Sequence, residues 1–157
     1  MQIKLIAVRK TDLAELNKLI SVYQNRLSHY IKFSFEIIPD IKNSKNLSEK
    51  KRKEKEGELI LKKICDSDFV ILLDENGSEM NSIKFSNFLQ KKMNSGLKRL
   101  ILVIGGPYGF SQSIYNKSFT KLAVSKMTFS HQMVRLFVIE QLYRAFTILK
   151  NEPYHHC

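Results

Sequence analysis

A short apolar run from Leu100 to Ile104, which stops at Gly105-Gly106-Pro107, constrains the fold of this chain more than any other stretch. A run of this length, closed by glycine and proline, is typical of a buried strand. Gly109 follows two residues later, so the strand leads into a loop with unusual backbone freedom. Ligands of open α/β sheets bind beyond the carboxyl ends of the strands. The stretch therefore predicts a buried strand that ends in a binding loop.

Strand patterns alternate with helical patterns along the rest of the chain. We expect strands at 2–8, 33–38, 68–73, 100–104 and around Leu122. Helices are expected after Thr11, from Ser48, from residue 81 or 82, at 112–116 and at 131–149. Such alternation predicts an α/β fold, with a mostly parallel sheet and helices on both faces. The length of 157 residues predicts a single domain, 1–157.

The first helix illustrates the local predictions. Thr11 is expected to cap it, and the apolar residues at helical spacing are expected to form its buried face. These residues are Leu13, Leu16, Leu19, Ile20, Tyr23 and Leu27.

The two cysteines do not indicate a metal site. Cys65 is expected to fill the core from a later helix, and Cys157 ends the chain. Neither has metal-ligand spacing, so we predict no metal site.

The charge balance points to a polyanionic partner. The formal net charge is +11, from 26 Lys and Arg against 15 Asp and Glu, and RNA is the polyanion that a basic cytoplasmic domain most often meets. No apolar run approaches the roughly 20 residues needed to cross a bilayer. The first ten residues read as a strand and not as a signal peptide. We therefore expect a cytoplasmic protein without membrane contact.

The most charged segment, 41–63, has nine Lys or Arg against four Glu. Its helical pattern is polar at first and becomes amphipathic at Leu59, Ile60 and Ile64. Two interpretations remain open at this point, namely a solvated helix and a direct RNA contact.

The last helical pattern, 131–149, is apolar around nearly its whole circumference. Such a helix is buried on several sides. In a chain of this size a second subunit is expected to cover one of those sides, which predicts a homodimer.

The glycine loop does not match the common phosphate-binding motifs. It follows the fourth strand and lacks both the G-x-G-x-x-G spacing of dinucleotide folds and the Gly-Lys-Ser/Thr of a P-loop. Phosphate cradling is therefore disfavoured, as is a nucleotide-dependent enzyme of ordinary doubly wound topology.

Several motifs together resemble one known family. The chain contains QIKLIAV, KEGELIL, IGGPYG, LAVSKMTFSHQMVR, EQLYRAF and a terminal PYH. This combination resembles the SPOUT-class methyltransferases that modify N3 of a pseudouridine in 23S ribosomal RNA. The resemblance covers essentially the whole chain. It implies a C-terminal trefoil knot, a homodimer, the ribosome as partner and S-adenosylmethionine as the methyl donor.

The resemblance also implies a set of site residues. Those expected to bind S-adenosylmethionine are Leu73, Gly105, Leu122, Ala123, Val124, Ser125, Lys126 and Met127. They lie where three of the expected strands end, so the pattern of strands agrees with this choice. The candidates that orient the base or accept its proton are Tyr154, His155 and His131.

Two arginines of the last helix are expected to face the RNA. Arg135 lies four residues after His131, on the same face, and Arg144 lies four residues after Glu140. For Arg144, an ordinary ion pair within the helix is an equally good explanation.

Two positions depart from the family pattern, Tyr108 in the glycine loop and His156 near the end. A histidine at 156 weakens the argument for a terminal cation, because it is mostly neutral at pH 7.

A second function remains possible at this stage. A non-catalytic RNA-binding protein, such as a ribosome assembly factor with the same fold, would share the basic charge. The intact glycine loop and cofactor segment argue against it.

Overall fold

A five-stranded sheet forms the centre of the protein, seen here in a computed structural model that describes residues 1–41 and 46–155. The strands are β1 (Gln2–Val8), β2 (Lys32–Ile38), β3 (Phe69–Glu79), β4 (Arg99–Ile104) and β5 (Thr120–Ala123). Their order is β2-β1-β4-β3-β5, and every pair is parallel. The predicted parallel α/β sheet is therefore confirmed, and the carboxyl ends of all its strands share one edge.

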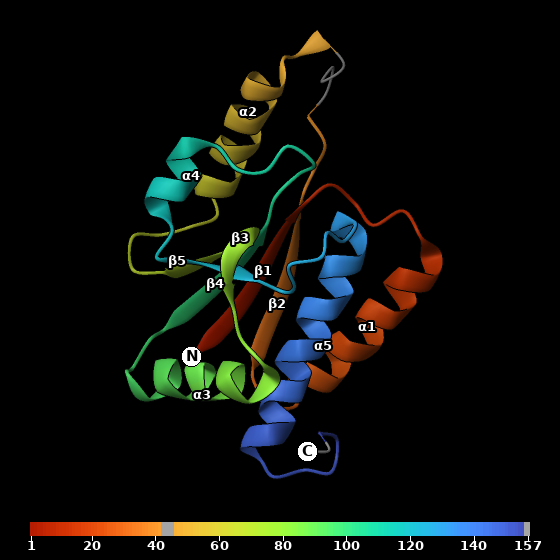
Figure 1. Ribbon diagram of the computed structural model, residues 1–157, viewed down its shortest axis with the longest axis vertical. Helices are drawn as coiled ribbons and strands as arrows, with labels where there is room; N and C mark the ends of the chain where they lie inside the picture. Colours follow the sequence, from red (N-terminus) through yellow and green to blue (C-terminus); the bar gives the residue numbers. More distant parts are fainter. Residues whose placement is uncertain (42–45, 156–157) are drawn as a thin grey trace.

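Helices cover both faces of this sheet (Figure 1). They are α1 (Ala14–Ser28), α2 (Glu49–Leu61), α3 (Ser82–Asn94), α4 (Gln112–Lys117) and α5 (His131–Leu149). On one face, residues such as Leu5 and Leu102 pack with α1, α3 and α5, and on the other, neighbours such as Ile6 and Val103 pack with α2 and α4. Successive strand residues are buried on opposite faces, which explains why these strands read as continuous apolar runs.

An ion pair holds the amino ends of two central strands together. Arg99, the first residue of β4, donates to Asp68 from Nε at 2.6 Å and from Nη2 at 2.5 Å. Burial tends to raise the pKa of Asp68, but hydrogen bonds from Arg99 and from the Cys65 amide outweigh it and hold the pKa below its usual value. The pair fixes the start of β4 at the edge opposite the glycine loop.

Three local predictions were wrong. Helix α1 begins at Ala14 without a side-chain cap, because the Thr11 hydroxyl instead accepts a hydrogen bond from Arg135. Of its expected apolar face, Leu13 is 55% exposed and Leu19 is 47% exposed. Cys65 is exposed and lies after α2, because that helix ends at Leu61.

Strand β3 is longer than predicted. It continues past Leu73 to Glu79, and its pairing with β5 shifts register between Leu73 and Ser78. The predicted stop at Asp74 relied on a turn-like sequence, whereas pairing with β5 keeps these residues extended.

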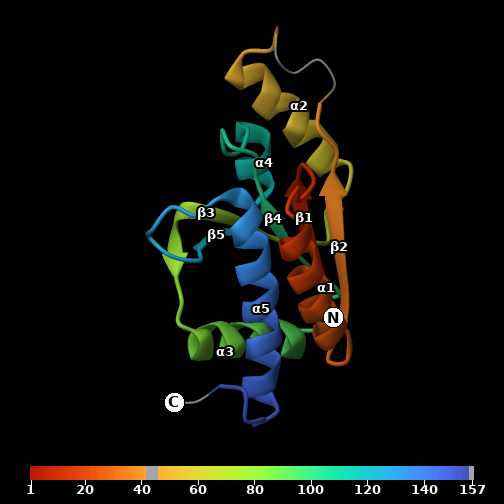
Figure 2. The same ribbon diagram turned by 90° about the vertical axis from the view of Figure 1, so that its right-hand side faces the viewer.

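Helix α5 lies against α1 and α3, with its axis along the long axis of the molecule (Figure 2). Its bounds match the prediction, and Ser130 caps it by accepting a hydrogen bond from the Met133 amide. With 19 residues it is about 28 Å long, so its two ends are far apart. One end lies at the carboxyl edge of the sheet, and the other leads to the C-terminal residues.

Candidate active site

The carboxyl ends of three neighbouring strands form one cavity. Leu73 of β3 pairs with Ile104 of β4 and with Leu122 of β5, so the loops that follow these strands emerge side by side. They enclose a cavity of about 620 Å³ that also includes the first turn of α5. This is the place that the glycine loop predicted.

Five of the eight predicted cofactor residues line this cavity, namely Leu73, Gly105, Val124, Ser125 and Met127. Leu122 and Ala123 line an adjoining cavity of about 350 Å³, which shares Leu73 and Val124 with the first. Lys126 is exposed and lines neither of the two. The structure thus brings the predicted residues to one region, with Lys126 at its margin.

The apolar part of the cavity wall comes from the segment between β5 and α5. Met127 is 73% exposed, and Val124 and Phe129 are also exposed. The Ser125 hydroxyl accepts from the Met127 amide at 3.0 Å, and Phe129 packs on Phe137 of α5 with ring centroids 5.1 Å apart. Exposed apolar side chains beside strand-end backbone suit a flat, largely apolar group such as adenine.

The glycine loop is a tight turn. The Gly109 amide donates to the Gly106 carbonyl at 3.0 Å, and Gly109 has a φ of +77°, which favours glycine. At Gly105, a Cβ would lie 3.1 Å from the ring of Phe110. Packing against Phe110 is therefore the first reason for a glycine at 105, in addition to its place in the cavity wall.

His131 faces the same cavity from the first turn of α5. Burial lowers its pKa, and the nearby charges of Arg135 and Arg9 lower it further, against the opposite effect of Asp12 and Asp40. The imidazole is therefore neutral at pH 7, and one ring nitrogen is available to accept a proton.

Arg135 does not fit its predicted role. Its side chain is fully buried, with Nη1 donating to the Thr11 hydroxyl at 2.6 Å and Nη2 to the Val8 carbonyl at 2.8 Å. A guanidinium in this position cannot reach an RNA phosphate. Arg135 instead ties α5 to the end of β1.

Tyr154 and His155 follow the carboxyl end of α5, whereas His131 is its first residue. The Tyr154 hydroxyl donates to Glu140 at 3.0 Å and lies 3.2 Å from the Tyr23 hydroxyl. Burial and these two hydrogen bonds raise the pKa of Tyr154, so it is a neutral donor at pH 7. His156 and Cys157 lie outside the described residues.

Arg144 belongs to the same cluster at the C-terminal end. It donates to Glu140 from Nε at 3.0 Å and from Nη2 at 2.6 Å, and Nη1 lies 3.4 Å from Nδ1 of His155. Its guanidinium also stacks over the ring of Tyr154, 4.6 Å from the centroid. The ion pair that the spacing suggested is therefore present.

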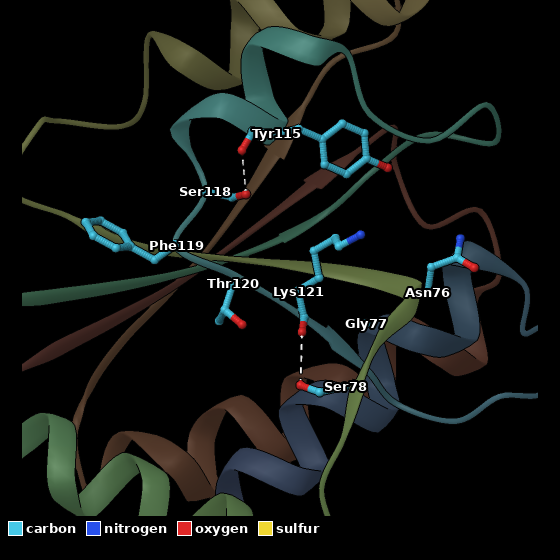
Figure 3. Close-up of a pocket in the computed structure, with 8 residues that line it drawn as sticks. All are labelled: Asn76, Gly77, Ser78, Tyr115, Ser118, Phe119, Thr120 and Lys121. Carbon is cyan, nitrogen blue, oxygen red and sulfur yellow. Dashed lines mark hydrogen bonds between the residues drawn. The ribbon is translucent and has the colours of Figure 1, made fainter.

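A third cavity, of about 670 Å³, runs along β5 at the edge of the sheet (Figure 3). Two hydroxyl groups of its wall bond to backbone carbonyls, Ser78 to Lys121 at 3.2 Å and Ser118 to Tyr115 at 2.8 Å. It contains none of the predicted site residues and none of the strand-end loop at 105–109. The cavity that His131 lines is therefore the candidate active site.

Sequence reasoning missed the residues behind the glycine loop. Glu56 of α2 lies against Gly106, with Arg9 and Arg52 close enough to act on its charge. The motif KEGELIL was noticed only as part of a resemblance, and its charged composition suggested a solvated helix. Nothing in its spacing shows that one glutamate of this helix is buried.

The fold and the cavity define an α/β protein with a ligand site at the carboxyl edge of a parallel sheet. A model of the family described as predicted SPOUT methyltransferase matches residues 1–155, and this chain belongs to that family. Membership implies the C-terminal trefoil knot. Among the described residues, no group of three or more His, Cys, Asp or Glu is placed to hold a metal ion, and no helix is long and apolar enough to span a membrane.

Curated relatives are similar over their full length. A protein of Christiangramia forsetii is 65% identical over 156 residues, with 99% of each chain covered. Proteins of Flavobacterium psychrophilum and Flavobacterium johnsoniae are 68% and 67% identical over the same length and coverage. All three carry the name ribosomal RNA large subunit methyltransferase H.

Proposed function

We propose that this chain transfers a methyl group from S-adenosylmethionine to N3 of a pseudouridine in 23S ribosomal RNA, as a cytoplasmic homodimer. Family membership and the names of the full-length relatives support the rRNA methyltransferase activity. The observation that carries the proposal is the cavity in which Leu73 and Gly105 meet Val124, Ser125 and Met127.

The residues present fit the proposed methyl donor. Exposed apolar side chains at Val124 and Met127 suit the faces of adenine, while the backbone after β3, β4 and β5 offers amides and carbonyls for its edge. When bound there, S-adenosylmethionine would supply an electrophilic methyl group to the base nitrogen. The protein's contribution is then mainly to hold the two reactants in a reactive geometry.

The reaction also requires removal of the N3 proton. His131 lines the cavity and is neutral at pH 7, so it is the first candidate to accept that proton. Tyr154 has a raised pKa and is a hydrogen-bond donor, which suits it to orienting a carbonyl group of the base. His155 is a second possible proton acceptor.

A second subunit can bring these residues together. The Tyr154 hydroxyl bonds to Glu140, which lies nine residues after His131 and therefore about 14 Å further along the axis of α5. Tyr154 does not line the cavity of its own chain. In a homodimer, the tail of each subunit can complete the cavity of its partner.

The surface of α5 also favours a dimer. Phe137, Leu136 and Met133 remain partly exposed, although α1 and α3 already pack on this helix. Ile139 of the same helix is fully buried in the core of the single chain. Phe137 is therefore the better position at which to disrupt a dimer.

The experiment is a titration of the purified protein with S-adenosylmethionine, followed by transfer of a labelled methyl group to ribosomes that lack the modification. We expect saturable binding, no binding of NAD, and one methyl group on the pseudouridine. RNA binding should weaken steeply with added salt, because phosphate contacts release counterions. Tight RNA binding without S-adenosylmethionine binding would instead identify a non-catalytic assembly factor.

A further inference from the structure

Helix α2 contacts the glycine loop at three successive points. The Arg52 guanidinium lies 5.1 Å from the ring centroid of Tyr108, and its Nη1 donates to the Tyr108 hydroxyl at 3.4 Å. The carboxylate of Glu56 lies against Gly106, and Gly57 lies against Ser111 so closely that a Cβ would come within 2.3 Å of its hydroxyl oxygen. Helix α2 also lies beside α4, into which the loop leads (Figure 1).

Glu56 is the unusual member of this contact. It is only 4% exposed, whereas Glu54 and Glu58 of the same helix are exposed. Its Oε2 atom is buried and has no hydrogen-bond partner among the described residues. Burying a carboxylate is costly unless something compensates for it, so its position calls for an explanation.

The surroundings of Glu56 supply part of that compensation. Burial raises the pKa of Glu56, the positive charges of Arg9 and Arg52 act to lower it, and Asp40 acts to raise it again. Arg9 has a φ of +72° and forms an ion pair with Asp40 at 2.9 Å. Unusual backbone at a residue other than glycine is concentrated at functional sites.

The same contact with Glu56 explains why residue 106 is a glycine. A Cβ at this position would lie 2.6 Å from Oε2 of Glu56 and 3.2 Å from its Oε1. The second glycine of the loop is therefore required by Glu56, just as the first is required by Phe110. Gly106 also lines the active-site cavity, so the carboxylate and the cavity lie on either side of one short piece of backbone.

We propose that Glu56 is a positioning residue for the methyltransferase site, which holds Gly106 and thereby the glycine loop in the conformation that binds S-adenosylmethionine. The inference rests on the proposed function, because the loop has a ligand only if that function is correct. Glu56 does not line the cavity, so it acts through the loop and not by touching the reactants.

The first experiment compares Glu56→Ala and Glu56→Gln with the matched control Glu58→Gln on the same helix. We expect the dissociation constant for S-adenosylmethionine, measured by calorimetry, to rise about tenfold in Glu56→Ala and less in the isosteric Glu56→Gln, since misplacing a binding group by about 1 Å has effects of this order. The control should bind as the wild type does. The KM for S-adenosylmethionine should rise with the dissociation constant, while kcat changes little, because the reacting atoms are not contacted.

The second experiment tests the contact itself. Gly106→Ala places a methyl group against the carboxylate and should weaken S-adenosylmethionine binding, and adding Glu56→Ala to it should restore part of the lost affinity. Such non-additivity is expected only for residues in contact. This pair keeps the inference testable even if Glu56→Ala alone folds poorly.

Two results would overturn the inference. One is a pair of Glu56 variants that melt at a lower temperature but bind S-adenosylmethionine within twofold of the wild type, which would make Glu56 purely structural. The other is strict additivity of Gly106→Ala and Glu56→Ala. Failure of the proposed function is distinguishable, because the wild-type protein would then not bind S-adenosylmethionine at all.

Discussion

The polar residues near the two ends of helix α5 differ in whether they face an open cavity or are already hydrogen-bonded to one another. At its start, His131 faces an open cavity whose wall includes exposed apolar side chains. At its end, Tyr154, Arg144 and Glu140 are already bonded to one another. The first region is ready to receive a ligand, whereas the second must exchange its internal bonds before it can hold one. In the proposed function, the cavity end of one chain therefore holds the cofactor, and the tail acts at the site of another subunit.

The largest effect is expected at the cavity end, from Gly105→Val. A Cβ at 105 already approaches the Phe110 ring to 3.1 Å, so the larger side chain must displace Phe110 or enter the cavity. We expect S-adenosylmethionine binding too weak to saturate in a calorimetric titration. The melting temperature should fall as well, so a control is needed that loses stability alone.

Gly96→Ala provides that control. Gly96 has a φ of +74° and open space where a Cβ would lie, so alanine strains the backbone by about 1–2 kcal/mol far from the cavity. It should melt earlier and bind S-adenosylmethionine normally. A Gly105→Val dimer with normal binding would show that the cavity is not the cofactor site.

The tail end is tested by mixing two inactive proteins. Tyr154→Ala should lose about a hundredfold in methyl transfer but still bind S-adenosylmethionine, since the residues proposed to hold the cofactor are unchanged. Mixed with Gly105→Val and allowed to exchange subunits, it should regain about a quarter of the wild-type sites, because half of the dimers are then mixed and each has one intact composite site. No recovery in dimers shown to be mixed would contradict a shared site.

A smaller effect is expected from Glu140→Gln. Glu140 accepts hydrogen bonds from Arg144 and Tyr154, and losing its charge should lower stability by about 1–2 kcal/mol. S-adenosylmethionine binding should not change. Glu15→Gln, at an exposed position on α1 that does not line the cavity, is the matched control for loss of a carboxylate. A clear drop in the affinity of Glu140→Gln would show that the two ends of α5 are coupled within one chain.

The fold was largely predictable because its signals are local. Strands β1 and β4 read as apolar runs, and α5 was predicted from His131 to Leu149 as observed. The errors arose where tertiary contacts outweigh local preference. Thr11 bonds to Arg135 across the structure and does not cap α1, and pairing with β5 extends β3 beyond Asp74.

The candidate site was predictable only in part. Residues placed by strand ends, such as Leu73 and Gly105, lie in the cavity as the pattern of strands indicated. The faces of helices were harder to predict. Arg135 and His131 lie four residues apart, yet the arginine is buried under the end of β1 while the histidine lines the cavity. Glu56 was missed because its burial depends on a loop that comes about fifty residues later in the sequence.

The smallest effect expected near pH 7 is the pH dependence of methyl transfer. It distinguishes the two ends of α5, because His131 titrates near this range and Tyr154 does not. The pKa of His131 is lowered by burial and by Arg135 and Arg9, so the folded state favours the neutral ring. The associated stability is therefore fully present above the ordinary histidine pKa of about 6.5 and is lost as the pH falls through the lower folded value. If His131 accepts the N3 proton, methyl transfer should be flat around pH 7. Below the folded pKa it should fall about tenfold per pH unit. Tyr154 cannot produce this limb, because its pKa is raised and it stays neutral throughout this range.

The measurement is the pH dependence of kcat/KM for the wild type, His131→Gln and His29→Gln. His29 is exposed at the end of α1, so its replacement should leave the profile unchanged. His131→Gln should be slower and should lose the acid limb, because glutamine fills a similar space without titrating. An acid limb that persists unchanged in His131→Gln would remove His131 as the proton acceptor. The remaining candidate would then be His155, delivered by the tail of the partner subunit, and the chemistry would depend on both ends of α5 and not on the cavity end alone.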